Sequence, residues 1–231
     1  MLTIGKAARV FVLTGAGISA ESGITTFRDA GGLWRSYRFE EVASPDAWKR
    51  DPALVWEFYS MRRRAAAAAR PNPGHFALAR LGRERAHRFF LCTQNVDDLH
   101  KQAGSLGAIH MHGELFKSRC DSCDRLPFAD MNLYEPPVAI PRCECGGLIR
   151  PHICWFGEVP FGLDLIYREL EQCDLFIAIG TSGSVEPAAS FASHVRGHAR
   201  TIYVGAEEPA NRFAFTECHL GKAGELLPAL F

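Results

Sequence analysis

Short apolar runs alternate with helical segments along most of this chain. Continuous apolar runs, typical of strands buried on both faces of a sheet, lie at residues 10–14, 88–93, 108–112, 149–156, 174–179 and 200–204. Segments with helical spacing or helix-start signals lie at residues 18–22, 44–50, 51–69, 74–81, 163–172 and 187–195. This alternation predicts an α/β protein with a doubly wound parallel sheet, into which a helical segment and a cysteine-containing segment are inserted.

The first apolar run leads into a glycine turn. Gly15, Gly17 and Ala20 fit the G-x-G-x-x-G/A pattern, in which glycines let the backbone approach a pyrophosphate at the start of a helix. A dehydrogenase would continue with a second strand and an acidic ribose-binding residue, within a βαβ unit of ~30 residues. Residues 24–50 lack that unit, because the glycine-rich segment 25–32 has no strand pattern. The sequence therefore predicts a phosphate-binding turn and disfavours a hydride-transferring dehydrogenase.

Four of the eight cysteines lie in one segment, as the close pairs Cys120/Cys123 and Cys143/Cys145. Two such pairs can wrap four thiolates around one tetrahedral zinc, and this ligation leaves no open position, so the metal is expected to be structural. The tight C-x-C spacing leaves open that Cys154 replaces one member, and the alternative is a set of unrelated reduced thiols. Either arrangement indicates a reducing compartment.

The composition argues against nucleic acid and membranes as partners, but it does not indicate a particular function. Lys plus Arg and Asp plus Glu both number 26, so no net charge draws the chain to nucleic acid or to a membrane surface. No apolar run reaches the ~18 residues of a membrane helix, and the first strand begins too soon for a signal peptide. We expect a cytoplasmic monomer that binds neither nucleic acid nor membrane.

Polar residues follow three of the predicted strands, at residues 93–97, 110–114 and 180–182. The carboxyl ends of parallel strands meet at one edge, where open α/β sheets bind ligands, so we expect these residues to converge on the glycine turn. Histidine titrates near neutrality. A histidine in that crevice therefore suits general-base work on a sugar hydroxyl.

These motifs, in this order, resemble those of sirtuins, the NAD-dependent protein-lysine deacylases. The resemblance extends from residue 10 to about 225 and is carried by residues 15–23, 26–28, 93–97, 110–113, 155–158 and 180–182 and by the two cysteine pairs. It implies a Rossmann-like NAD-binding domain of residues 1–38, 74–116 and 155–231. The small domain would combine a helical insertion, 39–73, with the zinc-binding module, 117–154. NAD would lie between the two.

The resemblance also implies a reaction that consumes NAD. The acyl oxygen of a modified lysine attacks the anomeric carbon of the nicotinamide ribose, and nicotinamide leaves. His112 would act as base toward the ribose hydroxyls, with Asn95 as the second catalytic residue, and His110 is expected to be a strand residue outside the site. Water then yields free lysine and O-acyl-ADP-ribose. The partners would be acyl-lysine proteins or peptides, whose backbone would pair with residues 155–158 as an added strand.

Further site residues are carried over by position. Those facing NAD would be Gly15, Ala16, Gly17, Glu21, Thr26, Phe27, Arg28, Trp34, Gln94, Asn95, Asp97, Gly180, Thr181, Ser182, Gly205, Glu207 and Ala223. Those facing the acylated substrate would be Ala30, Tyr59, Arg62, Trp155, Phe156 and Gly157. The metal ligands would be Cys120, Cys123, Cys143 and Cys145.

Tyr59 and Arg62 refine the expected substrate. They lie three residues apart on one helix face, and a Tyr-x-x-Arg pair in this helix resembles the sirtuin class with affinity for acidic acyl groups. An arginine fork can pair with a succinyl or malonyl carboxylate, a phenol adds a hydrogen bond, and small Ala30 leaves room for the chain. The alternative is a solvated basic helix, since Arg63 and Arg64 are adjacent.

One segment departs from the family pattern. Where relatives commonly place asparagine in an Asn-x-Glu turn, this chain has Gly205-Ala206-Glu207, by substitution or by a shift of one residue. Two other functions stay open. Mono-ADP-ribosyl transfer would use the same cofactor pocket, and a non-catalytic NAD-sensing or interaction module would use it without chemistry.

Overall fold

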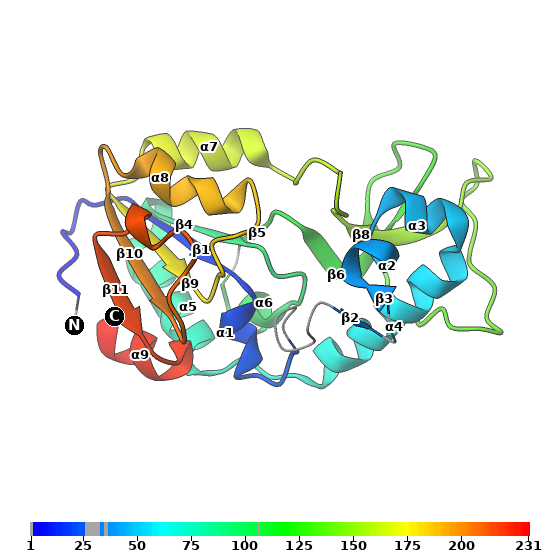
Figure 1. The fold of residues 1–231 in the computed structure, drawn as a ribbon, viewed down its shortest axis with the longest axis horizontal. Coiled ribbons are helices and arrows are strands. Elements are labelled where there is room, and N and C mark those ends of the chain that lie inside the picture. Colours follow the sequence, from blue (N-terminus) through cyan, green and yellow to red (C-terminus); the bar gives the residue numbers. More distant parts are fainter. Residues whose placement is uncertain (1, 26–32, 35–36, 106) are drawn as a thin grey trace.

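A six-stranded parallel sheet forms the larger part of the molecule. The computed structural model describes residues 2–25, 33–34, 37–105 and 107–231 (Figure 1). The strands, in spatial order, are β11 (Glu217–Leu220), β10 (Arg200–Gly205), β9 (Leu175–Ile179), β1 (Val10–Thr14), β4 (Phe89–Thr93) and β5 (Ile109–His110). All neighbouring pairs run parallel. The chain moves outward from β1 first to one side and later to the other, which creates the switch point where open sheets bind ligands.

Helices cover both faces of this sheet, as the strand pattern predicts. Phe11 and Leu13 of β1 pack toward α7 (Leu163–Glu171) and α8 (Phe191–Val195). Val10 and Val12 face the opposite side, in the cluster that includes α5 (Pro73–Arg85) and α9 (Ala223–Leu230). Figure 1 shows the two pairs of helices on either side of the strands. The doubly wound α/β prediction is confirmed.

A second, smaller unit lies at the opposite end of the molecule from the two chain termini (Figure 1). Its antiparallel sheet has the order β7 (Phe128–Ala129), β6 (Gly113–Cys120), β8 (Ile149–Ile153). Its helices are α2 (Phe39–Val42), α3 (Pro45–Arg50) and α4 (Pro52–Ala68). Aromatic residues including Trp48, Trp56 and Trp155 share its core. Ser44 and Asp51 cap α3 and α4 as their sequence positions predict, each accepting a backbone N–H three residues on.

Short elements complete the described chain. The remaining strands are β2 (Leu33–Trp34) and β3 (Tyr37–Arg38), which pair antiparallel. The remaining helices are α1 (Ala16–Ala20), α6 (Leu99–Gln102) and the 3₁₀ turns η1 (Ala86–Arg88), η2 (Ala188–Ser190) and η3 (Arg212–Ala214).

Some sequence expectations differ from the structure. The apolar run 149–156 ends as a strand at Ile153 and joins the small antiparallel sheet rather than the large parallel one. Its partner β6 was not predicted, because its sequence mixes charged and apolar residues and its pairing is with a segment far along the chain. The terminal elements β11 and α9 were also missed, and both complete the large sheet's edge and covering layer.

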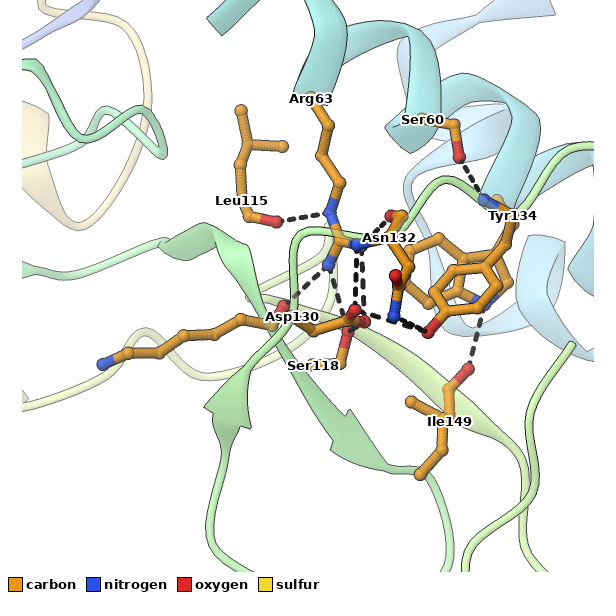
Figure 2. A network of polar contacts seen from close by, with 10 residues as sticks. Ser60, Arg63, Leu115, Ser118, Asp130, Asn132, Tyr134 and Ile149 are labelled. Carbon is orange, nitrogen blue, oxygen red and sulfur yellow. Dashed lines mark hydrogen bonds and ion pairs between the residues drawn. The ribbon is translucent and has the colours of Figure 1, made fainter. Parts of the chain in front are cut away.

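A buried arginine fixes α4 against the small sheet. The side chain of Arg63 is only 1% exposed, and its Nε donates to the Leu115 carbonyl at 2.7 Å. Its terminal nitrogens reach the Asp130 carboxylate, at 3.3 Å, and Ser118 Oγ, at 3.0 Å (Figure 2). A buried ion pair is favourable when its remaining polar groups are also hydrogen-bonded, and here Lys117 and Ser118 of β6 supply those bonds. The rotation of α4 about its axis is thereby set.

Candidate active site

Two glycine turns pack directly against each other at the carboxyl edge of the large sheet. Gly15 and Gly17 follow β1, and Gly180 follows the adjacent strand β9. The Gly17 amide donates to the Gly180 carbonyl at 2.8 Å, and a Cβ on residue 15 or 17 would lie 2.8 Å from Gly180 backbone atoms. The pattern that predicted a phosphate turn is therefore also required for packing, because any side chain here would separate β1 from β9.

Asn95 is locked in place at this edge. Its Nδ2 donates to the Gly15 carbonyl and to Ser19 Oγ, both at 3.0 Å, and its backbone N–H donates to Thr93 Oγ1. The neighbouring Gln94 donates from Nε2 to Thr181 Oγ1 at 3.0 Å. The segments after β1, β4 and β9 are thus brought together as expected from the topology.

His112 lies at the same edge, after β5, in a defined protonation state. Its Nδ1 is 3.0 Å from the Gln94 carbonyl oxygen, which can only accept, so Nδ1 carries the hydrogen and Nε2 carries the lone pair. Burial lowers the pKa of this imidazole, although the bond to Gln94 opposes the shift. Gly113 allows the turn that follows, because its φ is +89° and a side chain there would run into the His152 carbonyl. The ring is therefore neutral at pH 7 and available as a base.

His110 contacts Asn95 directly, and Asp97 shares Ser19 with Asn95 as a hydrogen-bond partner. The Asp97 side chain is buried, which raises its pKa, while hydrogen bonds from the Leu99 amide and Ser19 oppose the shift. His110 belongs to β5, and its Nδ1 donates to the Asn95 carbonyl at 3.0 Å. His110 is thus a strand residue, as expected, but one that contacts a predicted site residue directly.

The other residues predicted to face the cofactor lie near α1 and α9, at the end of β10, and beside the two glycine turns; some predicted site residues are not described by the structure. Glu21 is exposed and accepts from the Gly224 amide at 3.0 Å, which ties α1 to the start of α9 beside buried Ala223. Gly205 ends β10, and Glu207 follows it on the surface. Ala16 and Ser182 flank the two glycine turns. Thr26, Phe27, Arg28 and Ala30 lie outside the described residues, and of Trp34 only its place in β2 is described.

The residues predicted to face the acyl group lie on α4 and after β8. Tyr59 is 1% exposed, its Oη accepts from Trp155 Nε1 at 3.0 Å, and burial raises its pKa to about 12. Arg62 Cζ lies 5.7 Å from the ring centroid of Phe58 and 5.9 Å from that of Tyr59. Burial lowers the pKa of Arg62, and the charges of Tyr59 and Asp97 oppose that shift. Helix α4 therefore brings Arg62 into the electrostatic neighbourhood of the predicted cofactor site.

The segment after β8 is held by a carboxylate that the sequence did not single out. Glu158 accepts from Arg150 at 2.7 and 3.0 Å and from the Trp155 amide at 2.8 Å. Within this segment Phe156 is 43% exposed and Gly157 has a φ of +89°. The signal for Glu158 was its place in the Trp-Phe-Gly-Glu motif, but its arginine partners come from the small sheet and could not be read from spacing.

The four paired cysteines form one cluster. Their Sγ atoms all lie within 4.8 Å of one another, with Cys120 and Cys145 3.5 Å apart and Cys123 and Cys143 3.8 Å apart. Tetrahedral zinc with Zn–S bonds of ~2.3 Å requires sulfur atoms ~3.8 Å apart, so this donor set fits a structural zinc. Cys154 lies elsewhere, with its Sγ 3.6 Å from the Glu158 carbonyl oxygen. The C-x-C pair is thus compatible with one closed site.

Comparison with known proteins identifies the family. A model described as the Sir2 family matches residues 15–187. The chain belongs to the Sir2 family. A NAD-dependent protein deacylase of Caulobacter vibrioides is 48% identical over 225 residues, which are 96% of this chain and 94% of that protein. One of Vibrio cholerae is 46% identical over 224 residues, 96% of this chain and 91% of that protein.

Solved Sir2 structures share the fold over almost the whole chain. A Sir2 homolog–NAD complex superposes with a TM-score of 0.89 at 42% identity, covering 97% of this chain and 89% of that one. A Sir2 complex with a deacetylated p53 peptide and 3'-O-acetyl ADP ribose gives a TM-score of 0.83 at 28% identity, with 96% and 92% covered. Within the described part of this Sir2 chain, every helix is too short or too polar to cross a bilayer.

Two buried histidines lie beneath the site of this Sir2 chain and were not predicted. His100 Nε2 is 2.9 Å from Thr14 Oγ1, whose own hydrogen goes to Thr93 Oγ1 at 2.8 Å, the atom that accepts from the Asn95 amide. The ring of His75 lies 5.0 Å from that of His100, centroid to centroid. Burial lowers the pKa of His75 to about 4 and that of His100 well below its usual value.

These histidines predict a loss of stability in mild acid. The unfolded imidazole takes up a proton near pH 6.5, whereas folded His75 stays neutral down to about pH 4. The contribution of His75 to the free energy of unfolding is therefore complete above pH 6.5. It is lost between pH 6.5 and 4, which lowers the free energy of unfolding by about 3 kcal/mol. Urea unfolding at pH 7.5 and 5 should show a smaller difference for His75→Leu than for wild type. The exposed His87→Ala serves as control, and an equal pH dependence in all three proteins would contradict the assignment.

Proposed function

We propose that this Sir2 chain is an NAD-dependent protein-lysine deacylase that prefers succinyl and malonyl groups and also removes acetyl. The products are nicotinamide, O-acyl-ADP-ribose and free lysine. The observation that carries the proposal is neutral His112, with its Nδ1–H on the Gln94 carbonyl and its Nε2 lone pair available at the edge where the glycine turns and Asn95 meet. The names of the bacterial relatives support the same class of reaction.

The donor set at this edge suits NAD. Bound NAD would supply an electrophilic anomeric carbon. His112 Nε2 would accept the proton of a ribose hydroxyl and so make that oxygen a nucleophile. Asn95 is held by Gly15 and Ser19, so its amide is in place before any ligand arrives. The Gly15–Ala20 turn would hold the phosphates, and Gln94, Asp97 and Thr181 would order the sugar and carboxamide groups.

Arg62 and Tyr59 support the preference for acidic acyl groups. Arg62 keeps its charge despite partial burial, since it is always protonated near neutral pH. The Tyr59 oxygen accepts from Trp155, which leaves its own hydrogen for a carboxylate, and its raised pKa keeps that hydrogen on the phenol. The solvated-helix alternative describes Arg64, which is exposed and pairs with Glu135, but not Arg63, which is buried.

The acylated peptide would lie beside residues 155–158. The amides of Trp155, Phe156 and Glu158 already donate within the protein, to the Glu158 carboxylate, the Ala43 carbonyl and the Trp155 carbonyl. A substrate strand would therefore use other backbone groups of this segment, such as those of exposed Gly157. A peptide-containing complex of a Sir2 relative supports a peptide as substrate.

One assay tests reaction, cofactor and acyl class together. Matched acetyl-, malonyl- and succinyl-lysine peptides are incubated with the protein, with and without NAD, and followed by mass spectrometry. We expect NAD-dependent loss of all three acyl groups, fastest for succinyl and malonyl, with one O-acyl-ADP-ribose per lysine released. Accumulation of ADP-ribosylated protein without acyl loss would indicate a mono-ADP-ribosyltransferase instead, and NAD binding without nicotinamide release a non-catalytic module.

In the same assay Arg62→Met should lower the ratio of succinyl to acetyl catalytic efficiency by about tenfold or more, the effect of losing a charge-assisted hydrogen bond. Arg64→Met, two residues on in the same helix, is the matched control and should leave the ratio unchanged. An unchanged ratio for Arg62→Met would remove the acidic-acyl preference while leaving the deacylase reaction standing.

A further inference from the structure

The hydroxyl of Tyr203 joins two turns at the edge of the large sheet. Tyr203 lies on β10, is 3% exposed, and packs its ring against Phe215 at a centroid distance of 5.5 Å. Its Oη is 2.9 Å from the Glu207 carbonyl oxygen and 3.1 Å from that of Thr181. Both partners can only accept, so the single hydrogen of the phenol is shared between the turn after β9 and the turn after β10.

Gly205 leaves the space that this phenol occupies. Residues 203 and 205 lie on the same face of β10, because side chains alternate along a strand. A Cβ on residue 205 would lie 2.7 Å from Tyr203 Cζ and 3.0 Å from Cε1, and closer still to the hydroxyl oxygen. Gly205 is an ordinary strand residue of β10, so the ring of Tyr203, rather than backbone conformation, excludes a side chain there.

The same hydroxyl begins a chain of hydrogen bonds that ends at His112. Tyr203 holds the Thr181 carbonyl, and Thr181 Oγ1 accepts from Gln94 Nε2 at 3.0 Å. The Gln94 carbonyl in turn accepts from His112 Nδ1 at 3.0 Å. These groups lie at the carboxyl ends of β10, β9, β4 and β5, so one side chain on the far side of β1 is connected across the sheet edge to the proposed base.

We propose that Tyr203 is a positioning residue for NAD, which fixes the turns after β9 and β10 through its hydroxyl, and that Gly205 is the space its ring requires. This rests on the proposed function, because it assumes that these turns face the cofactor. Residue 205 offers NAD no side chain. The turns after β9 and β10 would instead present their backbone to NAD in one conformation, which lowers the ordering cost of binding.

The test is calorimetric titration with ADP-ribose, which lacks the nicotinamide leaving group and therefore cannot undergo the reaction. Tyr203→Phe keeps the ring packing and removes only the hydroxyl. We expect it to bind ADP-ribose about 3- to 10-fold more weakly than wild type, the cost of one hydrogen bond. The KM for NAD should rise by a similar factor while the KM for the acyl peptide stays constant. Tyr167→Phe, whose ring packs on Phe191 on the same side of the sheet, is the control.

A second pair of variants tests the role of Gly205. Gly205→Ala should weaken ADP-ribose binding in wild type but not in a Tyr203→Leu background, where the ring is gone, so the two effects should be strongly non-additive. Equal ADP-ribose affinity in wild type and Tyr203→Phe, or additive effects at 203 and 205, would overturn the positioning role alone. Failure of wild type to bind ADP-ribose would overturn the proposed function itself, and the positioning role with it.

Discussion

Replacing His112 with alanine should lower kcat/KM for a succinyl-lysine peptide by about 10²- to 10⁴-fold, the contribution typical of a positioned general base. The reason is geometric. The Gln94 carbonyl fixes the Nδ1–H tautomer, so Nε2 is the only nitrogen of this ring that can accept a proton. ADP-ribose affinity should change far less, because His112→Ala removes a proton acceptor and leaves the glycine turns and Asn95 in place. Steady-state kinetics and calorimetry on the same preparation measure both.

Two comparisons sharpen this prediction. His87→Ala removes an exposed imidazole and should leave turnover unchanged. The acid limb of the wild-type pH profile should be centred below the ordinary histidine value near pH 6.5, because burial lowers the pKa of His112 and the base is active when neutral. Near-wild-type turnover of His112→Ala, or an acid limb centred above pH 7, would rule out His112 as the base.

Replacing Cys120 with serine should remove the zinc and unfold much of the small unit. A structural zinc contributes of order 10 kcal/mol to the folding of small metal-binding modules, so the effect should exceed that of any single core substitution. Cys120 ends β6, and Cys143 and Cys145 precede β8, so losing the metal frees the strands on which Arg63 and α4 rest. Elemental analysis should show zinc falling from one equivalent to a small residue, and calorimetry a strongly lowered Tm.

Cys154→Ser is the matched control for the zinc site. Its thiol is half-buried and contacts the Glu158 carbonyl rather than the cysteine cluster, so the variant should keep a full equivalent of zinc and a Tm close to wild type. The preference for succinyl over acetyl should disappear from Cys120→Ser together with its stability, since α4 carries Tyr59 and Arg62. A Cys120→Ser protein with a full equivalent of metal and normal stability would contradict the assignment.

The sequence predicted those parts of the fold that are set by local pattern. The buried strands at β1, β4, β9 and β10 were readable because each is a short continuous apolar run between helical segments. Strand β6 was not, because a half-buried strand with charged residues has no clear period, and only its partners β7 and β8 make it a strand. The run 149–156 had a strand's composition, but composition does not say which sheet a strand joins.

The residues of the candidate site were likewise predictable only where a local sequence pattern marks them. Gly15, Asn95, Asp97 and His112 could be named because each follows a predicted strand, and parallel strands bring their carboxyl ends together. The residues that hold them in place could not be named. Ser19 holds Asn95 and Tyr203 holds the Thr181 carbonyl through contacts with residues far away in the chain, and such contacts leave no spacing signal.

The sequence by itself determined the strand–helix alternation, the cysteine pairs and the glycine turn, since each depends on residues close together in the chain. The tertiary structure alone decided that Gly15 and Gly17 must be small because Gly180 packs on them, and that His112 is neutral with its lone pair on Nε2. It also decided that Tyr203 takes the space beside Gly205. The first two follow from contacts across neighbouring strands, and the third from the hydrogen bond that holds Tyr203 to the turn after β9. None of these contacts exists until the sheet has formed.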